Sequence, residues 1–193
     1  DYVCGLSLGE YSALSAAGVF DPKTAIQVVR ERGLAMEKAA EGVESAMMAI
    51  LGLEREPLLD ICVGCDGYVS IANYNCPGQL VIAGEKKAVE EAGQKALDHG
   101  ARRAVPLNTS GPFHTKLLKD ASTRLHEVFK DVTFHEMNVP VIFNCTGKEL
   151  ENCSVQDMLE KQVMSPVYFE DSIRTMINNG VDTIIEIGPG KVL

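Results

Sequence analysis

The sequence has 193 residues, of which 46% are hydrophobic, with a mean hydropathy of +0.01 and a formal net charge of −9. A chain of this length and apolar content can bury a sizeable core. Its acidity argues against a general nucleic-acid-binding protein, because binding a polyanion depends on a face rich in lysine and arginine. No apolar run reaches the roughly 18–20 residues that a membrane span needs, and no signal-peptide pattern is present, so we expect a cytoplasmic protein without a membrane partner.

The first predicted elements are a short strand and two helices. Val3-Cys4 has the apolar character of the end of a buried strand, and a helix that ends at Gly18 is expected after a sharp turn. Asp21 and Pro22 are typical of an N-cap followed by proline at the first helical position. The helix that they start is expected to run until Gly42 breaks it.

From about residue 45 the predicted elements become short and closely spaced. Strands are expected at residues 46–51, 68–72, 79–83 and 102–107, and helices at 54–63 and 85–100. The turn Asn75-Cys76-Pro77-Gly78 separates the second strand from the third. This density of elements indicates a small α+β unit of the ferredoxin-like kind at residues 44–112.

Longer helical periods resume after a turn-rich loop at residues 108–112. Helices are expected at residues 115–130, 155–162 and 170–179, and nearly all-apolar strands at 141–144 and 183–187. Such strands are usually buried on both faces, as in a parallel sheet covered by helices. We therefore predict an α/β fold, in which residues 1–43 and 113–193 form a parallel-sheet part that the small unit interrupts.

The cysteines do not indicate a metal centre. Six cysteines stand at irregular spacings in a chain long enough to fold without disulfide bonds, so we expect reduced thiols. Cys62 and Cys65 form a single CxxC pair, with no second pair and no nearby histidine. We interpret this pair as structural, and we expect neither a metal nor a cofactor.

A candidate nucleophile stands near the start of the chain. Gly5-Leu6-Ser7-Leu8-Gly9 fits the G-x-S-x-G nucleophile elbow, and it lies between a predicted strand and a predicted helix, as that motif requires. The two glycines are expected to permit the tight turn and close packing that expose Ser7. The serine then lies at the positive end of the following helix, where backbone N–H groups can hold an oxyanion.

One of the four histidines is a candidate base for this serine. His99, His126 and His135 lie among charged or mixed residues and are interpreted as ordinary surface or packing residues. His114 instead follows the loop Ser110-Gly111-Pro112-Phe113, between the end of a predicted strand and the start of a helix. Loops at strand ends are where the sites of α/β proteins assemble.

Six blocks of sequence resemble the malonyl-CoA:acyl carrier protein transacylase family, in the family's order and at about its spacing. The resemblance implies an α/β-hydrolase-like acyltransferase core, and transfer of a malonyl group from malonyl-CoA to the phosphopantetheine thiol of an acyl carrier protein for fatty-acid synthesis. The transfer would be ping-pong, through a serine acyl-enzyme. The blocks are Gly5 to Leu14, Arg32-Gly33 with Met36, Asn75-Cys76-Pro77-Gly78-Gln79, Gly111-Pro112-Phe113-His114, Gln162 with Ser165-Pro166-Val167, and Gly188-Pro189-Gly190-Lys191-Val192-Leu193.

The resemblance assigns four catalytic positions. Ser7 would attack the malonyl thioester, and His114 would take its proton and return it to the leaving thiol. The backbone N–H of Leu8 would supply part of the oxyanion hole. The family uses a backbone carbonyl rather than a carboxylate to orient the histidine, at the position that matches Gln162.

Three further positions are implied to bind substrate. Arg32 could hold the malonyl carboxylate bidentately with its planar guanidinium, although by itself an arginine in a helix usually covers the surface. Phe113 matches an aromatic position that accompanies unbranched malonyl units, and its ring is expected to crowd an α-methyl group. Asn75, with Gln79, would line a cleft between the sheet and the insert, but a plain turn explains both equally well.

Two departures from the family pattern stand out. Leu6 occupies a position where the family usually has histidine, which should remove a secondary contact rather than a catalytic group. The family also has a Gly-Gln-Gly segment far upstream of the serine, thought to complete the oxyanion hole. We therefore expect the 193 residues to be a fragment that lacks an N-terminal segment and the C-terminal end, and full activity to depend on the missing portion.

Two other functions remain open from the sequence. A serine esterase or thioesterase would share the elbow and deliver the acyl group to water, whereas an inactive truncated domain would only bind the carrier protein. An acidic carrier protein would need a local basic patch on this acidic chain. The candidate basic residues lie in segments that flank His114: Lys86, Lys87, Lys95, Arg102, Arg103, Lys116 and Lys119.

Overall fold

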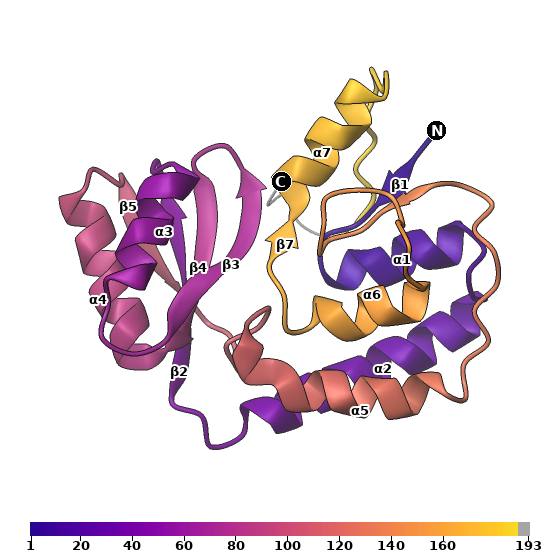
Figure 1. Ribbon diagram of the computed structural model, residues 1–193, viewed down its shortest axis with the longest axis horizontal. Helices are drawn as coiled ribbons and strands as arrows, with labels where there is room; N and C mark the ends of the chain where they lie inside the picture. Colours follow the sequence, from indigo (N-terminus) through magenta and orange to yellow (C-terminus); the bar gives the residue numbers. More distant parts are fainter. Residues whose placement is uncertain (189–193) are drawn as a thin grey trace.

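The computed structural model describes residues 1–188, which form a mainly helical part beside a smaller sheet-containing part (Figure 1). The helical part contains a two-stranded parallel sheet, in which Val3 pairs with Val141 and Cys4 pairs with Ile142. Its elements are β1 (Val3–Cys4), α1 (Leu8–Ala16), α2 (Pro22–Ala40), the 3-10 turn η1 (Lys116–Leu118), α5 (Lys119–Phe129), β6 (Val141–Ile142), α6 (Val155–Gln162), β7 (Val167–Tyr168) and α7 (Phe169–Asn178).

The smaller part has the ferredoxin-like arrangement that its sequence predicts. Its strands stand in the order β5-β2-β4-β3, and helices α3 and α4 provide the two crossovers. β7 then joins the edge of this sheet, parallel to β3, from outside the range 44–112. The two parts therefore share one sheet, and the boundaries drawn at 44 and 112 stay a prediction. The elements of this part are β2 (Ser45–Leu51), α3 (Arg55–Val63), β3 (Val69–Cys76), β4 (Gln79–Glu85), α4 (Lys86–Asp98) and β5 (Arg103–Leu107).

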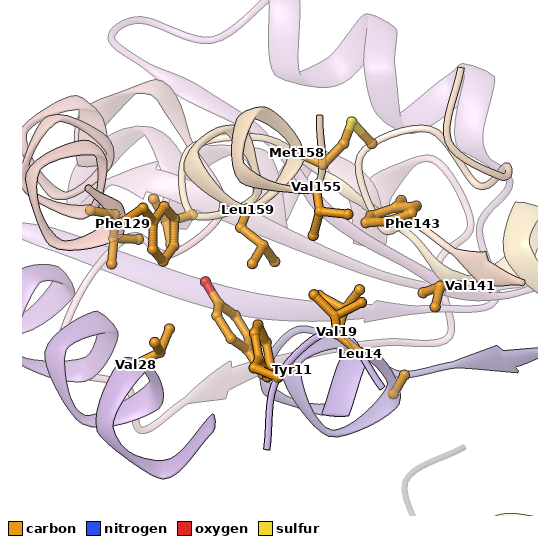
Figure 2. Packing of buried hydrophobic residues seen from close by; sticks show 14 of the residues in the cluster. Tyr11, Leu14, Val19, Val28, Phe129, Val141, Phe143, Val155, Met158 and Leu159 are labelled. Atoms are coloured by element: carbon orange, nitrogen blue, oxygen red, sulfur yellow. The ribbon is translucent and has the colours of Figure 1, made fainter. Parts of the chain in front are cut away.

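Each part has its own hydrophobic core. In the helical part, side chains of α1, α2, α5 and α6 pack together with Val141 of β6, and Tyr11, Leu14 and Leu159 are completely buried there (Figure 2). Full burial of one such aliphatic side chain contributes roughly 1.5–3 kcal/mol. This packing fixes α1 against β1, and thereby fixes the turn that joins them.

The ends of α2 follow from its sequence. The Asp21 carboxylate accepts hydrogen bonds from the backbone N–H groups of Lys23 at 2.8 Å and Thr24 at 3.1 Å, and Pro22 occupies the first helical position. The helix ends at Ala40, and Gly42 follows with a φ of 74°. The predicted start and end of this helix are confirmed.

One predicted turn is shorter in the structure than in the sequence analysis. β3 continues through Asn75 to Cys76, so the hairpin turn consists of Pro77 and Gly78 only. Gly78 has a φ of 69°, a conformation that side chains rarely adopt. Both Asn75 and Cys76 therefore belong to a strand.

The strand predicted at residues 183–187 is wrong. These residues form no helix or strand, and Ile185 and Ile187 are 78% and 92% exposed. An apolar run becomes a strand only where a neighbouring strand accepts its backbone hydrogen bonds, and within residues 1–188 no strand pairs with this run. The last of the six blocks extends over residues 189–193, which lie outside the described residues.

Of the helices within residues 1–188, none has the length and apolar character that a membrane crossing requires.

Candidate active site

A sharp turn between β1 and α1 presents Ser7. The backbone of Ser7 has a φ of 53° and a ψ of −101°, a conformation that costs about 1–3 kcal/mol and persists only where surrounding contacts hold it. A Cβ on Gly5 would lie 2.1 Å from the carbonyl of Gly9, so only glycine fits at position 5. A Cβ on Gly9 would meet nothing within 4 Å. The close packing predicted for both glycines is therefore required of Gly5 alone.

Asn144, which the sequence analysis did not single out, holds both sides of this turn. Its Oδ1 accepts a hydrogen bond from the Ser7 N–H at 2.6 Å, and its Nδ2 donates to the Gly5 carbonyl at 2.7 Å. Asn144 lies just beyond the end of β6, which pairs with β1. The Asn144 side chain thus makes hydrogen bonds with the β1–α1 turn, beyond the point where the backbones of β1 and β6 pair. The sequence feature that could have indicated Asn144 is its position at the carboxyl end of a predicted parallel strand.

The structure brings Ser7, His114 and the backbone of Gln162 into one chain of hydrogen bonds. The Oγ of Ser7 lies 2.7 Å from Nε2 of His114, and Nδ1 of His114 lies 2.9 Å from the carbonyl oxygen of Gln162. Because a carbonyl only accepts, Nδ1 carries the proton and Nε2 is left as the acceptor for the serine hydroxyl. A backbone carbonyl rather than a carboxylate therefore orients the ring, as the resemblance implies, and leaves Nε2 facing the serine hydroxyl.

Burial keeps this histidine uncharged. His114 is almost completely enclosed, and its backbone has a φ of 60°. Burial lowers the pKa of His114 to about 4, and the positive charge of Arg32 acts in the same direction. The imidazole is thus neutral, and able to accept a proton, throughout the neutral pH range.

Arg32 lies inside the site rather than on the surface of its helix. Its side chain is 6% exposed; Nη2 donates to Ser7 Oγ at 2.9 Å and to Gln162 Oε1 at 3.0 Å, and Nε donates to the same Oε1 at 3.2 Å. The guanidinium also lies over the Tyr11 ring, 5.4 Å from its centroid. Within residues 1–188 no carboxylate forms an ion pair with Arg32. Arg32 is therefore a buried cation whose hydrogen-bond partners are all uncharged.

The residue predicted to supply an oxyanion donor, Leu8, lies at the start of α1. Leu8 is the first residue of α1, where an N–H has no acceptor within the helix and points toward the positive end of the helix dipole. The Ser7 carbonyl on the other side of the elbow accepts from Gln162 Nε2 at 2.9 Å. Three of the four predicted catalytic residues therefore contact one another directly, and the fourth adjoins Ser7.

Phe113 and Asn75 lie at different distances from this chemistry. Phe113 packs against the cores of both parts, so its ring stands at their junction beside His114. A Cβ on Gly111 would lie 2.5 Å from the Ala40 side chain and 3.3 Å from the Phe113 ring, which explains the glycine there. Asn75 is buried in β3 and donates to Gln79 at 3.1 Å. Among the described residues it forms no hydrogen bond with the serine, the histidine or the arginine.

The other three histidines are exposed, as the sequence predicts, and form no part of the site. His126 pairs with Glu160 at 3.0 Å, and His99 contacts the carbonyl of Lys95. Within residues 1–188 no three His, Cys, Asp or Glu side chains gather in a way that could hold a metal ion.

Sequence comparison places the chain among known acyltransferases. The family described as acyl transferase domain matches residues 1–193. A malonyl CoA-acyl carrier protein transacylase of Bacillus subtilis (strain 168) is 47% identical over 197 residues, which cover 100% of this chain and 62% of that protein.

Solved structures show the same similarity and confirm the predicted acyltransferase fold. An acyl-carrier-protein S-malonyltransferase from Burkholderia pseudomallei 1710b matches with a TM-score of 0.95 and 38% identity, over 99% of this chain and 63% of that one. A malonyl-transacylase in complex with a type II PKS acyl-carrier protein matches with a TM-score of 0.93 and 40% identity, over 98% and 62%. The chain thus spans less than two thirds of the length of these relatives. Its match over all 193 residues shows that it belongs to the acyl transferase domain family.

Proposed function

We propose that this protein transfers a malonyl group from malonyl-CoA to the phosphopantetheine thiol of an acyl carrier protein, for fatty-acid synthesis, through an acyl-enzyme on Ser7. The single observation that carries the proposal is the position of Arg32. A buried guanidinium without a carboxylate partner donates a hydrogen bond to the candidate nucleophile itself. An acyl group on Ser7 that ends in a carboxylate would place that charge against the arginine. The names of the similar transacylases support the same donor and acceptor.

The first half-reaction uses the contacts within the site. Ser7 Oγ forms a bond to the thioester carbonyl carbon while His114 Nε2 takes the hydroxyl proton over the 2.7 Å contact. The developing oxyanion would be held by the N–H of Leu8. When the carbon–sulfur bond breaks, the imidazolium returns its proton to the coenzyme A thiolate, which leaves malonyl-Ser7 and a neutral base.

The second half-reaction runs these steps in reverse with a different thiol. The phosphopantetheine thiol gives its proton to His114, and its sulfur attacks the ester carbonyl. The Ser7 oxygen leaves with that proton. Both half-reactions need only the serine, the histidine and donors of the chain, so we propose that no cofactor takes part. We also place the protein in the cytoplasm, which the six free cysteines support.

Orientation of the histidine favours transfer over the hydrolase alternative. The esterase triad orients its histidine with Asp or Glu, whereas Nδ1 of His114 contacts the carbonyl of Gln162. Arg32 further matches a carboxylate-bearing acyl group rather than a neutral ester. A domain that only binds the carrier protein would have no need of a base 2.7 Å from a serine hydroxyl.

The test is the mass of the intact protein after incubation with malonyl-CoA. We expect the mass to increase by one malonyl group, and to return to its starting value when acyl carrier protein is added. Ser7→Ala should show no increase, whereas Ser12→Ala, an exposed serine on the same helix, should behave as the unchanged protein does. Loss of the malonyl group to water at the same rate with and without carrier protein would support the hydrolase instead.

A further inference from the structure

Glu10 is a buried carboxyl group to which the proposed mechanism gives no role. It lies on α1 one turn after Ser7 and has no exposed surface. Its Oε2 accepts a hydrogen bond from the backbone N–H of Asn144 at 2.5 Å, and its Oε1 has no partner among the described residues. Although Arg32 lies near enough to affect its pKa, the two form no ion pair.

The contact that Glu10 makes leads directly to the nucleophile. The side chain of Asn144 holds the N–H of Ser7 and the carbonyl of Gly5, and its own backbone N–H is held by Glu10. The Asn144 carbonyl accepts from Tyr168 N–H at 2.8 Å. All the backbone and side-chain groups of Asn144 are thus paired, and Glu10 supplies the acceptor on the helix side.

The state of the carboxyl group matters because a charge is buried beside it. An ionised carboxylate in this position would be a buried charge with a hydrogen-bond donor within reach of only one oxygen, which costs more than a neutral carboxyl whose O–H lacks an acceptor. It would also neutralise the nearby guanidinium of Arg32 and so weaken the binding of a second carboxylate there.

We propose that Glu10 is a positioning residue which acts through Asn144: its uncharged carboxyl fixes the amide that holds the Ser7 backbone, and it leaves the charge of Arg32 available for the acyl carboxylate. The first half of the inference concerns the serine alone. The second half rests on the proposed function, because it requires an acyl group with a carboxylate.

The pKa values of the surrounding groups favour the uncharged form near neutral pH. Burial raises the pKa of Glu10 to about 8, against the lowering effects of the Asn144 N–H, of Arg32 and of the Gln162 side chain. Burial also raises the pKa of Cys4 to about 11 and of Cys145 to about 12, and raises that of Tyr11 above its ordinary value. The groups that face Glu10 are Cys4 of β1, Tyr11 of α1, Arg32 of α2 and Cys145 after β6. None of these four titrates between pH 7 and 9, because arginine stays protonated and the pKa values of the other three lie above this range.

The experiment first measures the rate at which a fluorophosphonate probe labels Ser7 in the full-length protein. In that reaction the serine oxygen displaces fluoride, and no malonyl group is involved. We expect Glu10→Gln, which keeps an acceptor for Asn144, to label within about twofold of the unchanged protein, and Glu10→Leu to label at least about tenfold more slowly. Glu37→Gln, an exposed position on α2, is the matched control. Equal labelling by all variants would overturn the positioning role.

A double-mutant cycle distinguishes positioning from general destabilisation. Asn144→Ala removes the side chain through which Glu10 acts, so adding Glu10→Leu to it should slow labelling by less than about twofold more. Independent, multiplying effects of the two changes would contradict a shared path. This comparison also holds if Glu10→Leu lowers stability, because the thermal unfolding of the unchanged protein, the two single variants and the double variant measures the loss of stability separately.

The KM for malonyl-CoA between pH 7 and 9 tests the charge. With a pKa of about 8, ionisation of Glu10 should raise this KM about tenfold by pH 9 in the unchanged protein and not in Glu10→Gln. An equal rise in both proteins would overturn the uncharged role. A protein that labels at Ser7 but transfers no malonyl group would instead overturn the proposed function, while the labelling results still decide the role of Glu10 in positioning.

Discussion

Gln162 and Arg32 form a two-point hydrogen bond in which a neutral amide oxygen, Oε1, accepts from both Nε and Nη2 of the guanidinium, at 3.2 and 3.0 Å. The same residue donates from Nε2 to the Ser7 carbonyl and accepts at its own carbonyl from His114. Through its fully buried side chain and its backbone, Gln162 therefore contacts Ser7, His114 and Arg32 together. The resemblance implied only the contact with the histidine.

Replacing Gln162 by Glu should reduce the preference for malonyl groups. The new carboxylate would pair with Arg32 and compete with the substrate carboxylate, whereas an acetyl group has no such competitor. A charged hydrogen bond contributes about 1.5–3 kcal/mol, so the ratio of kcat/KM for malonyl-CoA to that for acetyl-CoA should fall roughly 10–100-fold. Gln156→Glu, on the same helix, should leave the ratio unchanged. Equal losses with both thioesters would show that the Gln162 side chain acts on the shared machinery around Ser7 and not on carboxylate recognition.

Arg32→Ala should separate carboxylate recognition from catalysis. Without the guanidinium the malonyl carboxylate loses its charged partner, so kcat/KM for malonyl-CoA should fall about 10²–10³-fold and that for acetyl-CoA much less. Arg30→Ala is the matched control, because Arg30 lies exposed on the same helix and pairs only with Glu31. If both thioesters are transferred equally slowly, Arg32 acts on the serine oxygen and not on the substrate.

The pH dependence of acylation should reflect the buried state of His114. A pKa of about 4 means that the imidazole is neutral above that pH, and that activity is lost only as the pH falls through it. We therefore expect kcat/KM for malonyl-CoA to stay level between about pH 5.5 and 7. A rate that falls by half near pH 6.5, the ordinary histidine value, would contradict this assignment.

Most of the elements, and the contact between Ser7 and His114, were predictable from sequence because local signals specify them. Asp21 with Pro22 starts α2, and the turn at Pro77-Gly78 joins two strands of the ferredoxin-like unit. Ser7 and His114 lie in turns that follow strands, and their neighbours in sequence, the G-x-S-x-G pattern and the loop at residues 110–113, indicate them directly. The run at residues 183–187 has the composition of a buried strand, but pairing depends on a neighbour that composition does not reveal.

The supporting residues of the site were not predictable in the same way. Asn144 and Glu10 matter because β6 lies parallel to β1, which places positions 134 residues apart in one hydrogen-bond chain. Glu10 left a trace in the sequence, since a carboxyl beside the apolar positions Tyr11 and Leu14 is unusual on a buried helix face. Its partner, however, could be identified only from the fold.

Phe113→Ser should widen acyl selectivity. Phe113 stands beside His114 at the junction of the two cores, and removing its ring leaves space for an α-methyl group. One methyl group in an apolar pocket changes selectivity about 10–200-fold, so the ratio of methylmalonyl to malonyl transfer should rise at least about tenfold. Phe113→Tyr, which keeps the ring, should retain the preference for malonyl. An unchanged ratio in Phe113→Ser would show that the α-methyl group of a methylmalonyl unit does not lie against the Phe113 ring.

The basic residues that flank His114 in sequence are separated by the fold. β5 and β7 occupy opposite edges of the five-stranded sheet, four strand spacings or about 19 Å apart. His114 lies on the β7 side, because it contacts Gln162, the last residue of α6, and α6 leads to β7. Arg103 lies in β5, and Arg102 directly precedes it. Lys116 instead lies two residues after His114, with its ammonium 4.2 Å from the centre of the Tyr68 ring, and Lys119 begins α5.

An acidic carrier protein that delivers its thiol to Ser7 should therefore meet the two lysines before the two arginines. We expect the double change Lys116→Glu and Lys119→Glu to slow transfer from malonyl-Ser7 to carrier protein about tenfold at low salt, and less at high salt, with acylation by malonyl-CoA unchanged. The same charge reversal at Arg102 and Arg103 is the matched control and should slow transfer less than about threefold. A larger effect of the arginine pair, measured by the decay of the malonylated mass, would move the docking surface to the β5 edge.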